Sequence, residues 1–217
     1  MNAVISNILQ RSSIRGYTQD EIPENDICSM IECARWAPSG SNTQPWRFIV
    51  IRSENIRNKL TSIVTNGFDA FWNALPDVEG KESVLGYRKY LEFMQSAPVL
   101  IAVLGKPYES LLTKMISSLN VEQHWNIHGA DPATLSIGAA IQNILLCAES
   151  LGYGSCWLTG PLMFQEQLES YLEVAEPWHL VSFITVGRPL QRKPRSQVHR
   201  KPLDEILTFM PEPGEQQ

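Results

Sequence analysis

The chain has 217 residues, a mass of 24.5 kDa, 43% hydrophobic side chains and a formal net charge of −5. These values suit one soluble domain with a sizeable core, and the mild acidity argues against broad nucleic-acid binding. The longest apolar stretches, 97–104 and 137–148, are too short or too polar to span a bilayer, and the first residues lack a signal-peptide pattern, so we expect a cytoplasmic protein with no membrane partner.

The first chemical feature is the cluster Arg11-Ser12-Ser13-Ile14-Arg15, which follows a helical apolar spacing between Val4 and Leu9. Guanidinium groups pair bidentately with phosphate oxygens, and serine hydroxyls add hydrogen bonds. The cluster therefore predicts a phosphate cradle. The alternative is a solvated basic turn.

The second feature is the stiff polar loop that runs from Ala37 to Phe48. It follows a helix expected between Pro23 and Ala37, and its two prolines bracket serine, asparagine, threonine and glutamine side chains. Prolines hold such a loop extended, so its polar groups point in fixed directions and suit a flat, polar-edged ligand. The alternative is a plain connector with an aromatic plug. The strand Phe48–Ile51 then reads as buried on both faces, and a helix follows that ends at Asn66-Gly67.

The middle of the chain is less regular. Aromatic residues lie among charged residues and glycines from Phe68 to Gln95, and they predict either a satellite core or a mobile lid over a pocket. Residues 97–105 read as a second, fully buried strand. His124 and His128 could share a helical face, but the glutamate and third ligand of a zinc site are missing. The four cysteines are dispersed, which favours reduced structural thiols, so we expect no metal site.

The clearest helix opens at Asp131-Pro132 and runs to about Leu151. Its polar Gln142 and Asn143 either satisfy a neighbouring loop or line a pocket. The following Gly152-Tyr153-Gly154 succeeds a helix and opens a strand, which is the reverse of a dinucleotide-binding fingerprint. At the end of that strand, Thr159-Gly160-Pro161 makes a sharp turn whose backbone could meet a ligand edge.

The last part of the chain predicts a short helix around Leu168, a third long strand at 180–187, a basic segment at 188–201, and a final helix or arm at Leu203–Leu207. Residues 211–217 are expected to be disordered. No nucleophile, Walker loop or paired-carboxylate arrangement is visible, which favours chemistry borrowed from a cofactor. The two basic segments and the polar loop together suit a phosphorylated, planar cofactor.

The chain resembles the FMN-dependent nitroreductase family over nearly its whole length. The resemblance rests on Arg11–Arg15, on the signature from Ala34 to Trp46, on the helix and strand from Ala139 to Trp157, and on the ending Gly187-Arg188-Pro189 with Arg200-Lys201-Pro202-Leu203. It implies an α+β fold with a mixed or antiparallel sheet surrounded by helices, and an intertwined homodimer with FMN at the subunit interface.

Motif positions then assign roles to individual residues. Arg11, Ser12, Ser13 and Arg15 would hold the phosphate and ribityl chain, with Arg200 adding positive charge. Pro38, Ser39 and Asn42 would come from the other subunit and border the flavin ring, and the Thr159-Gly160 backbone would face the reactive edge. Arg88 or Lys89 could serve as the basic residue near the pyrimidine edge.

The resemblance implies one domain, 1–217, with a variable lid and substrate region at 67–131 and a C-terminal arm at 188–217. NADH or NADPH would reduce FMN, and a small acceptor such as a nitroaromatic or a quinone would reoxidise it in a ping-pong cycle. Two alternatives stay open. The same scaffold could oxidise an organic substrate or act on its own flavin, or it could bind flavin without turnover.

Overall fold

A four-stranded sheet forms the centre of the computed structural model, which describes residues 2–76, 81–108, 111, 114–115, 131–192 and 199–210. Its strand order is β1-β2-β4-β3, and every neighbouring pair is antiparallel. The strands are β1 (Trp46–Ile51), β2 (Val99–Gly105), β3 (Gly154–Leu158) and β4 (His179–Gly187). The predicted α+β class is confirmed, and the choice between a mixed and an antiparallel sheet is settled as antiparallel.

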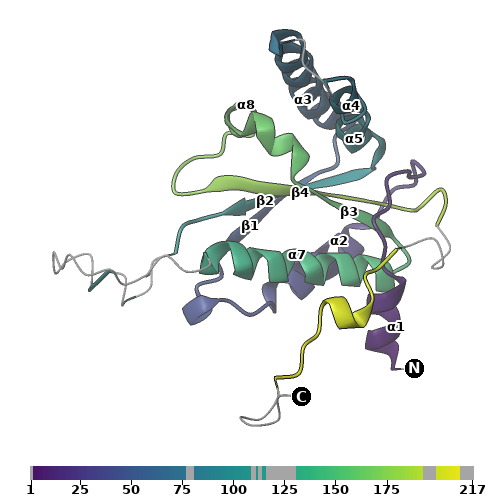
Figure 1. The fold of residues 1–217 in the computed structure, drawn as a ribbon, viewed down its shortest axis with the longest axis vertical. Coiled ribbons are helices and arrows are strands. Elements are labelled where there is room, and N and C mark those ends of the chain that lie inside the picture. The colour runs from purple at the N-terminus through teal and green to yellow at the C-terminus, as the bar shows by residue number, and fades with distance from the viewer. Residues whose placement is uncertain are drawn as a thin grey trace.

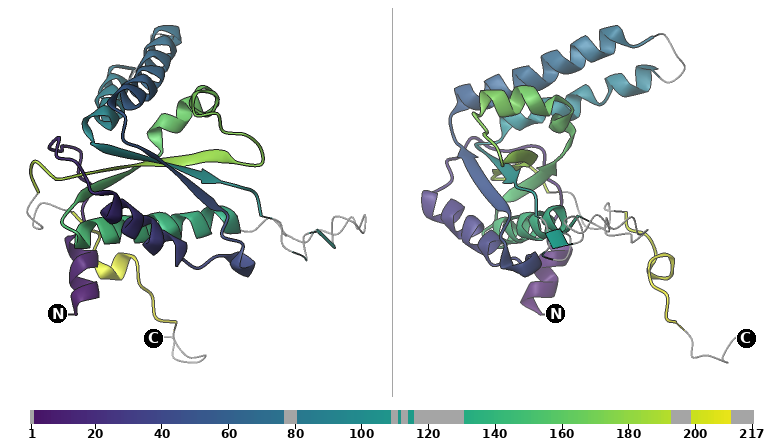
Figure 2. Two further views of the ribbon diagram at one scale, coloured as in Figure 1. Left: turned by 180° about the vertical axis from the view of Figure 1, so that it is seen from behind. Right: turned by 90° about the vertical axis from the view of Figure 1, so that its left-hand side faces the viewer.

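Helices cover both faces of this sheet (Figure 1). One face carries α2 (Glu24–Arg35) and α7 (Pro132–Ser150). The other face carries α3 (Glu54–Ala74), α4 (Lys81–Leu85), α5 (Arg88–Glu92) and α8 (Gln165–Tyr171). Figure 2 shows α3 and the α4–α5 pair as an elongated helical hairpin that projects beyond the sheet.

The central strand β2 is a continuous apolar run because both of its faces are buried. Val99, Ile101 and Val103 belong to the core shared with α2 and α7, whereas Leu100 and Leu104 belong to the core shared with α3 and α8. Successive side chains of a strand point to opposite faces, so burial on both faces requires apolar residues at every position. The prediction of a fully buried strand is confirmed, since all seven residues of β2 are buried.

Strand β1 differs from its prediction. The expected strand, Phe48–Ile51, was to be buried on both faces, yet only Ile51 is buried and Val50 is 37% exposed. The reason is position. Among the described strands, β1 lies at an edge of the sheet and pairs with β2 alone. β-branched sequence indicates a strand but does not say whether the strand is central or peripheral.

Helix α3 also corrects an expected boundary. The sequence Asn66-Gly67 predicts a helix end, but α3 continues to Ala74. A Cβ atom on Gly67 would stand 2.5 Å from ring carbons of Phe164, so the glycine allows a close approach between α3 and the 3-10 helix Gly160–Phe164. Tertiary packing therefore uses Gly67 inside the helix, where local propensity alone would place a stop.

Helix α7 matches its prediction and has a defined start. The Asp131 carboxylate caps it by accepting hydrogen bonds from the backbone amides of Ala133 (3.0 Å) and Thr134 (3.3 Å), and Pro132 occupies the first turn. Eight of its residues are buried, so α7 packs through the middle of one core.

The two ends of the described chain lie outside both cores. Helix α1 (Ala3–Gln10) has no buried residue, and the C-terminal segment forms only a 3-10 turn, Leu203–Glu205. Figure 2 shows that the C-terminal segment projects away from the sheet and its helices. Within the described residues, no helix is both long and apolar enough to cross a membrane. His124, His128 and the tail 211–217 lie outside the described residues.

Candidate functional site

The Arg11–Arg15 segment runs along strand β3, the second edge of the sheet. Ser13 forms a parallel bridge with Ser155, and the amide of Ile14 donates to the Ser155 carbonyl at 3.0 Å. Gly154 permits this approach, because a Cβ atom there would stand 2.7 Å from Cγ1 of Ile14. The arrangement spreads the predicted cluster over both ends of β3 and does not gather it at one point.

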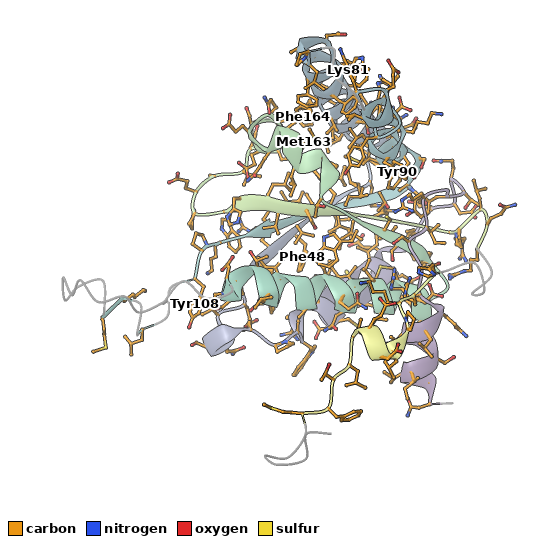
Figure 3. All side chains as sticks on the ribbon, in the orientation of Figure 1. Phe48, Lys81, Tyr90, Tyr108, Met163 and Phe164 are labelled. Carbon is orange, nitrogen blue, oxygen red and sulfur yellow. The ribbon has the colours of Figure 1, made fainter. Side chains whose placement is uncertain are left out.

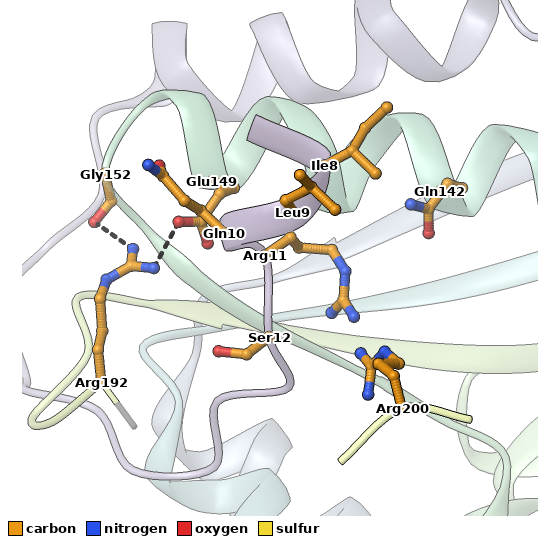
Figure 4. Close-up of a pocket in the computed structure, with 10 residues that line it drawn as sticks. All are labelled: Ile8, Leu9, Gln10, Arg11, Ser12, Gln142, Glu149, Gly152, Arg192 and Arg200. Carbon is orange, nitrogen blue, oxygen red and sulfur yellow. Dashed lines mark hydrogen bonds and ion pairs between the residues drawn. The ribbon is translucent and has the colours of Figure 1, made fainter. Parts of the chain in front are cut away.

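At the first end, Arg11 and Ser12 line a cavity of about 930 Å³. Arg200 from the C-terminal segment lines the same cavity, and Figure 4 shows its guanidinium and that of Arg11 facing one opening. Within the described chain, neither arginine has a carboxylate partner. Two unneutralised cations and a hydroxyl favour an anionic ligand, and phosphate suits the planar guanidinium geometry.

A third arginine, Arg192, lines this cavity and was not singled out from the sequence. Its guanidinium pairs with the Glu149 carboxylate at 2.6 Å and donates to the Tyr153 carbonyl at 3.2 Å. The side chain of Glu149 is only 8% exposed, so this pair ties the C-terminal segment to the end of α7. The basic composition of 188–201 was the only available signal, and it does not single out one arginine.

At the other end of β3, Arg15, Thr159 and Gly160 line a second pocket of about 380 Å³. Its walls are rich in aromatic rings, contributed by Tyr87, Tyr90, Phe93 and Trp157. Arg15 lies over the Tyr90 ring, with its guanidinium carbon 5.5 Å from the ring centroid, and Figure 3 marks the place of Tyr90 at the base of the helical hairpin. A planar ligand with an electron-rich edge fits such a pocket.

Ser13 lines neither pocket. Its side chain faces the Cys156 thiol of β3. Burial raises the pKa of Cys156, and the nearby Arg15 guanidinium and Ser13 hydroxyl oppose that shift in part. Cys156 therefore stays a neutral thiol beneath the Arg11–Arg15 segment. The structural role of Ser13 is its backbone bridge to Ser155 of β3.

The polar loop lies elsewhere, beside the N-terminal end of α7. Three of its residues, Ser41, Asn42 and Gln44, have a positive φ, and the Ser39 hydroxyl accepts from the Gln44 amide at 3.1 Å. The loop meets α7 where the Gly40 amide donates to the Ser136 hydroxyl at 3.4 Å. Such a backbone is costly for residues other than glycine and persists only where neighbouring contacts hold it.

One further contact fixes the tip of the loop. The hydroxyls of Ser41 and Tyr108 are 2.7 Å apart, and Figure 3 shows Tyr108 beside this end of α7. The predicted residues Pro38, Ser39 and Asn42 thus stay together on a preorganised loop. Within one chain they do not join Arg11 and Arg200, which lie near the opposite end of α7.

The two basic residues suggested near the pyrimidine edge of the flavin, Arg88 and Lys89, both lie on α5. Arg88 pairs with Asp69 of α3 at 2.7 Å and also with Glu92. Its charge therefore links the two arms of the hairpin, and neither Arg88 nor Lys89 lines the described pockets. Arg15 is the basic residue that the fold brings to the Thr159–Gly160 turn.

The two polar residues on α7 differ in role, and the partner of Asn143 is a helix and not the expected loop. The Asn143 side chain donates to the Cys33 carbonyl of α2 at 2.9 Å, which satisfies a neighbouring element, whereas Gln142 lines the larger cavity. Within the described residues, no cluster of three or more histidine, cysteine or acidic side chains could hold a metal ion.

Comparison with known proteins identifies similar chains. A sequence model described as the nitroreductase family matches residues 8–188. A Bacillus subtilis protein named NAD(P)H nitroreductase YodC is 22% identical over 211 residues, covering 97% of this chain and 100% of that protein. An Archaeoglobus fulgidus protein named NADH dehydrogenase/NAD(P)H nitroreductase is 28% identical over 196 residues, covering 89% of each. The 5,6-dimethylbenzimidazole synthase of Rhodospirillum rubrum is 26% identical and covers 88% of this chain and 83% of that protein.

Two solved structures are similar to this chain in both fold and sequence. A BluB-like flavoprotein from Clostridium difficile superposes with a TM-score of 0.86 at 28% identity, covering 97% of this chain and 100% of that one. A nitroreductase-type protein from Desulfovibrio desulfuricans, solved in complex with FMN, has a TM-score of 0.67 at 26% identity and covers 98% and 99% of the two chains.

Proposed function

This chain belongs to the nitroreductase family, and we propose that it is an FMN-dependent oxidoreductase. In this proposal NADH or NADPH donates hydride, and a small acceptor such as a nitroaromatic or a quinone takes up the electrons in a separate binding step. FMN, when bound, supplies the redox chemistry, and the protein supplies binding, orientation and electrostatics.

The observation that carries the proposal is the pairing of two pockets along β3. The first holds Arg11 and Arg200, which have no carboxylate partner among the described residues, together with the Ser12 hydroxyl. These groups fit a phosphate. The second holds Arg15 among aromatic walls at the Thr159–Gly160 turn, which fits a flat ring system. One ligand with a phosphate at one end and a planar ring at the other would use both. Arg15 would then stabilise negative charge on the ring.

We further propose that the site is completed by a second copy of the chain. Helix α1 exposes Val4, Ile5, Ile8 and Leu9. The described part of the C-terminal arm exposes Leu190, Leu203, Ile206, Leu207, Phe209 and Met210. Apolar surface of this kind is typical of a chain that packs against a partner. In a homodimer, the loop carrying Pro38, Ser39 and Asn42 would border the ring held by the other subunit.

Residues 1–217 would act as one domain in this proposal. The described part of 67–131 includes the end of α3 and the α4–α5 arm of the hairpin. Residues of α5 border the second pocket, which supports a role in shaping the substrate site. The arm at 188–217 supplies Arg192 and Arg200 to the first cavity, which supports a role in cofactor binding as well as in assembly.

The test follows the absorbance of the purified protein. We expect bound FMN, bleaching by NADH or NADPH under anaerobic conditions, and return of the oxidised spectrum when a quinone or nitroaromatic is added. Stopped-flow traces with each nicotinamide separate the reductive half-reaction from the oxidative one. Protein that cannot be reconstituted with FMN would refute the proposal.

A second candidate is supported by two of the relatives. One relative is named 5,6-dimethylbenzimidazole synthase and another is described as a BluB-like flavoprotein, so proteins similar to this chain are not all named nitroreductases. This chain would then act on its own flavin with oxygen, or oxidise an organic donor. Chromatography of the flavin after aerobic incubation of the reduced protein tests the first form, because only that form predicts loss of intact FMN. Bleaching by an organic donor and not by NADH or NADPH would support the second form. A carrier without turnover would bind FMN and show no steady-state consumption of nicotinamide.

A further inference from the structure

The pocket at the Thr159–Gly160 turn contains a hydroxyl that no part of the described chain uses. Tyr87 immediately precedes α5, and its hydroxyl oxygen lies 3.0 Å from the position that a Cβ atom on Gly160 would take. Within the described chain this hydroxyl makes no hydrogen bond. By contrast, the Tyr153 hydroxyl donates to Asp26 at 2.6 Å, and the buried Tyr17 hydroxyl contacts Thr185 at 2.8 Å.

The position of Tyr87 is set by the helical hairpin. Its backbone amide donates to the Val84 carbonyl at 2.9 Å, and its own carbonyl accepts from the Tyr90 amide at 2.9 Å. The next residue, Arg88, ties α5 to α3 through Asp69. The Tyr87 hydroxyl is therefore presented over the turn by a braced element, and the missing side chain of Gly160 leaves room for it.

The chemistry of the pocket limits what can bind beside this hydroxyl. Among the described residues that line it, Arg15 carries the single formal charge and no carboxylate is present. The aromatic walls favour a planar aromatic ligand. A neutral hydroxyl donor then favours a ligand with an oxygen acceptor on its rim, because a ligand without one would cover the hydroxyl and leave it unpaired.

We propose that Tyr87 determines acceptor specificity by donating a hydrogen bond to a nitro or carbonyl oxygen of a planar aromatic acceptor that stacks beside the flavin ring in the Thr159–Gly160 pocket. This inference rests on the proposed function and deepens it, because it names the group that selects oxygen-bearing aromatics. Tyr87 acts here as a binding group, and no proton needs to leave it.

The test compares two probes of similar size, nitrobenzene and chlorobenzene, which differ in their oxygen acceptors. Their dissociation constants for the oxidised, FMN-loaded protein are measured by calorimetry for the wild type, Tyr87→Phe and Tyr171→Phe. We expect Tyr87→Phe to raise the nitrobenzene constant about 3- to 10-fold, the range that one neutral hydrogen bond supplies, and to leave chlorobenzene within about 2-fold. Tyr171→Phe, which removes a hydroxyl on α8 outside the pocket, should change neither.

Equal weakening of both probes by Tyr87→Phe would overturn the proposal, because it would indicate lost packing and not a lost hydrogen bond. An unchanged nitrobenzene constant, or no binding of either probe to the wild type, would overturn it as well. FMN content and melting temperature of each variant identify a folding defect. If Tyr87→Phe shows one, Tyr87→Leu, which also lacks a donor, repeats the comparison. Bleaching of the wild type by NADH or NADPH is recorded on the same preparation, so failure of the proposed function is seen separately from failure of this inference.

Discussion

The shared cofactor site makes a quantitative prediction about mixed dimers. The loop meets α7 at Ser136, whereas Arg192 meets it at Glu149. At a rise of about 1.5 Å per residue, these contacts are roughly 20 Å apart along the helix axis. Within a single chain the loop therefore lies far from the phosphate cavity. Two chains related by a two-fold axis can bring them together.

The perturbation uses two variants that damage opposite halves of the site. Arg11→Glu reverses a charge in the phosphate cavity, and the double variant Ser39→Ala, Asn42→Ala removes polar groups from the loop. As homodimers, each carries the same defect in both sites and should lose FMN. In a dimer formed from one chain of each kind, one site collects both defects and the other collects none. With random pairing about half of the dimers are mixed, so the mixture should recover about a quarter of the wild-type FMN content.

The assay measures flavin absorbance per chain after the two variants are unfolded together, refolded and passed through gel filtration. Mixed dimers isolated with two different affinity tags should contain about half of the wild-type FMN. Each variant refolded alone is the control. If the mixture contains only the average of the two controls, each site is built from one chain and the reasoning from α7 fails.

Three further predictions concern stability and reactivity. Gly154→Ala should lower the free energy of unfolding by about 1–3 kcal/mol through overpacking, and it should weaken FMN binding. The control Gly16→Ala, whose Cβ would meet its nearest atom at 3.6 Å, should be nearly neutral. Urea titrations at fixed protein concentration compare the two, and equal effects would contradict the steric argument. Asp131→Ala should cost about 1 kcal/mol at neutral pH. A hydroxyl and two amides of the first turn of α7 hold the pKa of Asp131 low. This stabilisation is therefore present above the unfolded-state pKa and should fade as pH drops from about 6 to about 3. If the difference in unfolding free energy between wild type and Asp131→Ala stays constant over that range, the cap is not its source. Burial raises the pKa of Cys147 to about 12, so near pH 8 a thiol reagent should label it far more slowly than the exposed Cys28, as peptide mass spectrometry can follow; equal rates would contradict the assigned environment.

The elements with strong periodicity were predictable from the chain alone. Helix α7 has a capping aspartate, a proline in its first turn and apolar residues around most of its circumference, and each signal acts within a few residues. Strand β2 is apolar at every position because two cores meet it from opposite sides. The motifs also identified Arg11, Arg15, Arg200 and the Thr159–Gly160 turn as polar positions of interest, because their residue types restrict the chemistry they can perform.

Other features depended on contacts between distant residues. Gly67 carries the sequence mark of a helix end, but the ring of Phe164 packs against it within a continuous α3. Arg88 could have faced a ligand, but Asp69 and Glu92 neutralise it. The edge position of β1 follows from which strands pair, and no local pattern contains that information.

Sequence by itself indicated most helices and strands and the chemical types gathered for a ligand, because propensity, periodicity and side-chain chemistry are local properties. The fold class was expected from the resemblance to a known family. Tertiary structure alone decided how those groups are distributed. It placed Arg11 and Arg15 in two different pockets along β3, and it added Arg192 to the first of them. It also set the Tyr87 hydroxyl over Gly160 and the polar loop at the far end of α7. These relations arise from packing between segments far apart in the chain, and no single segment contains them.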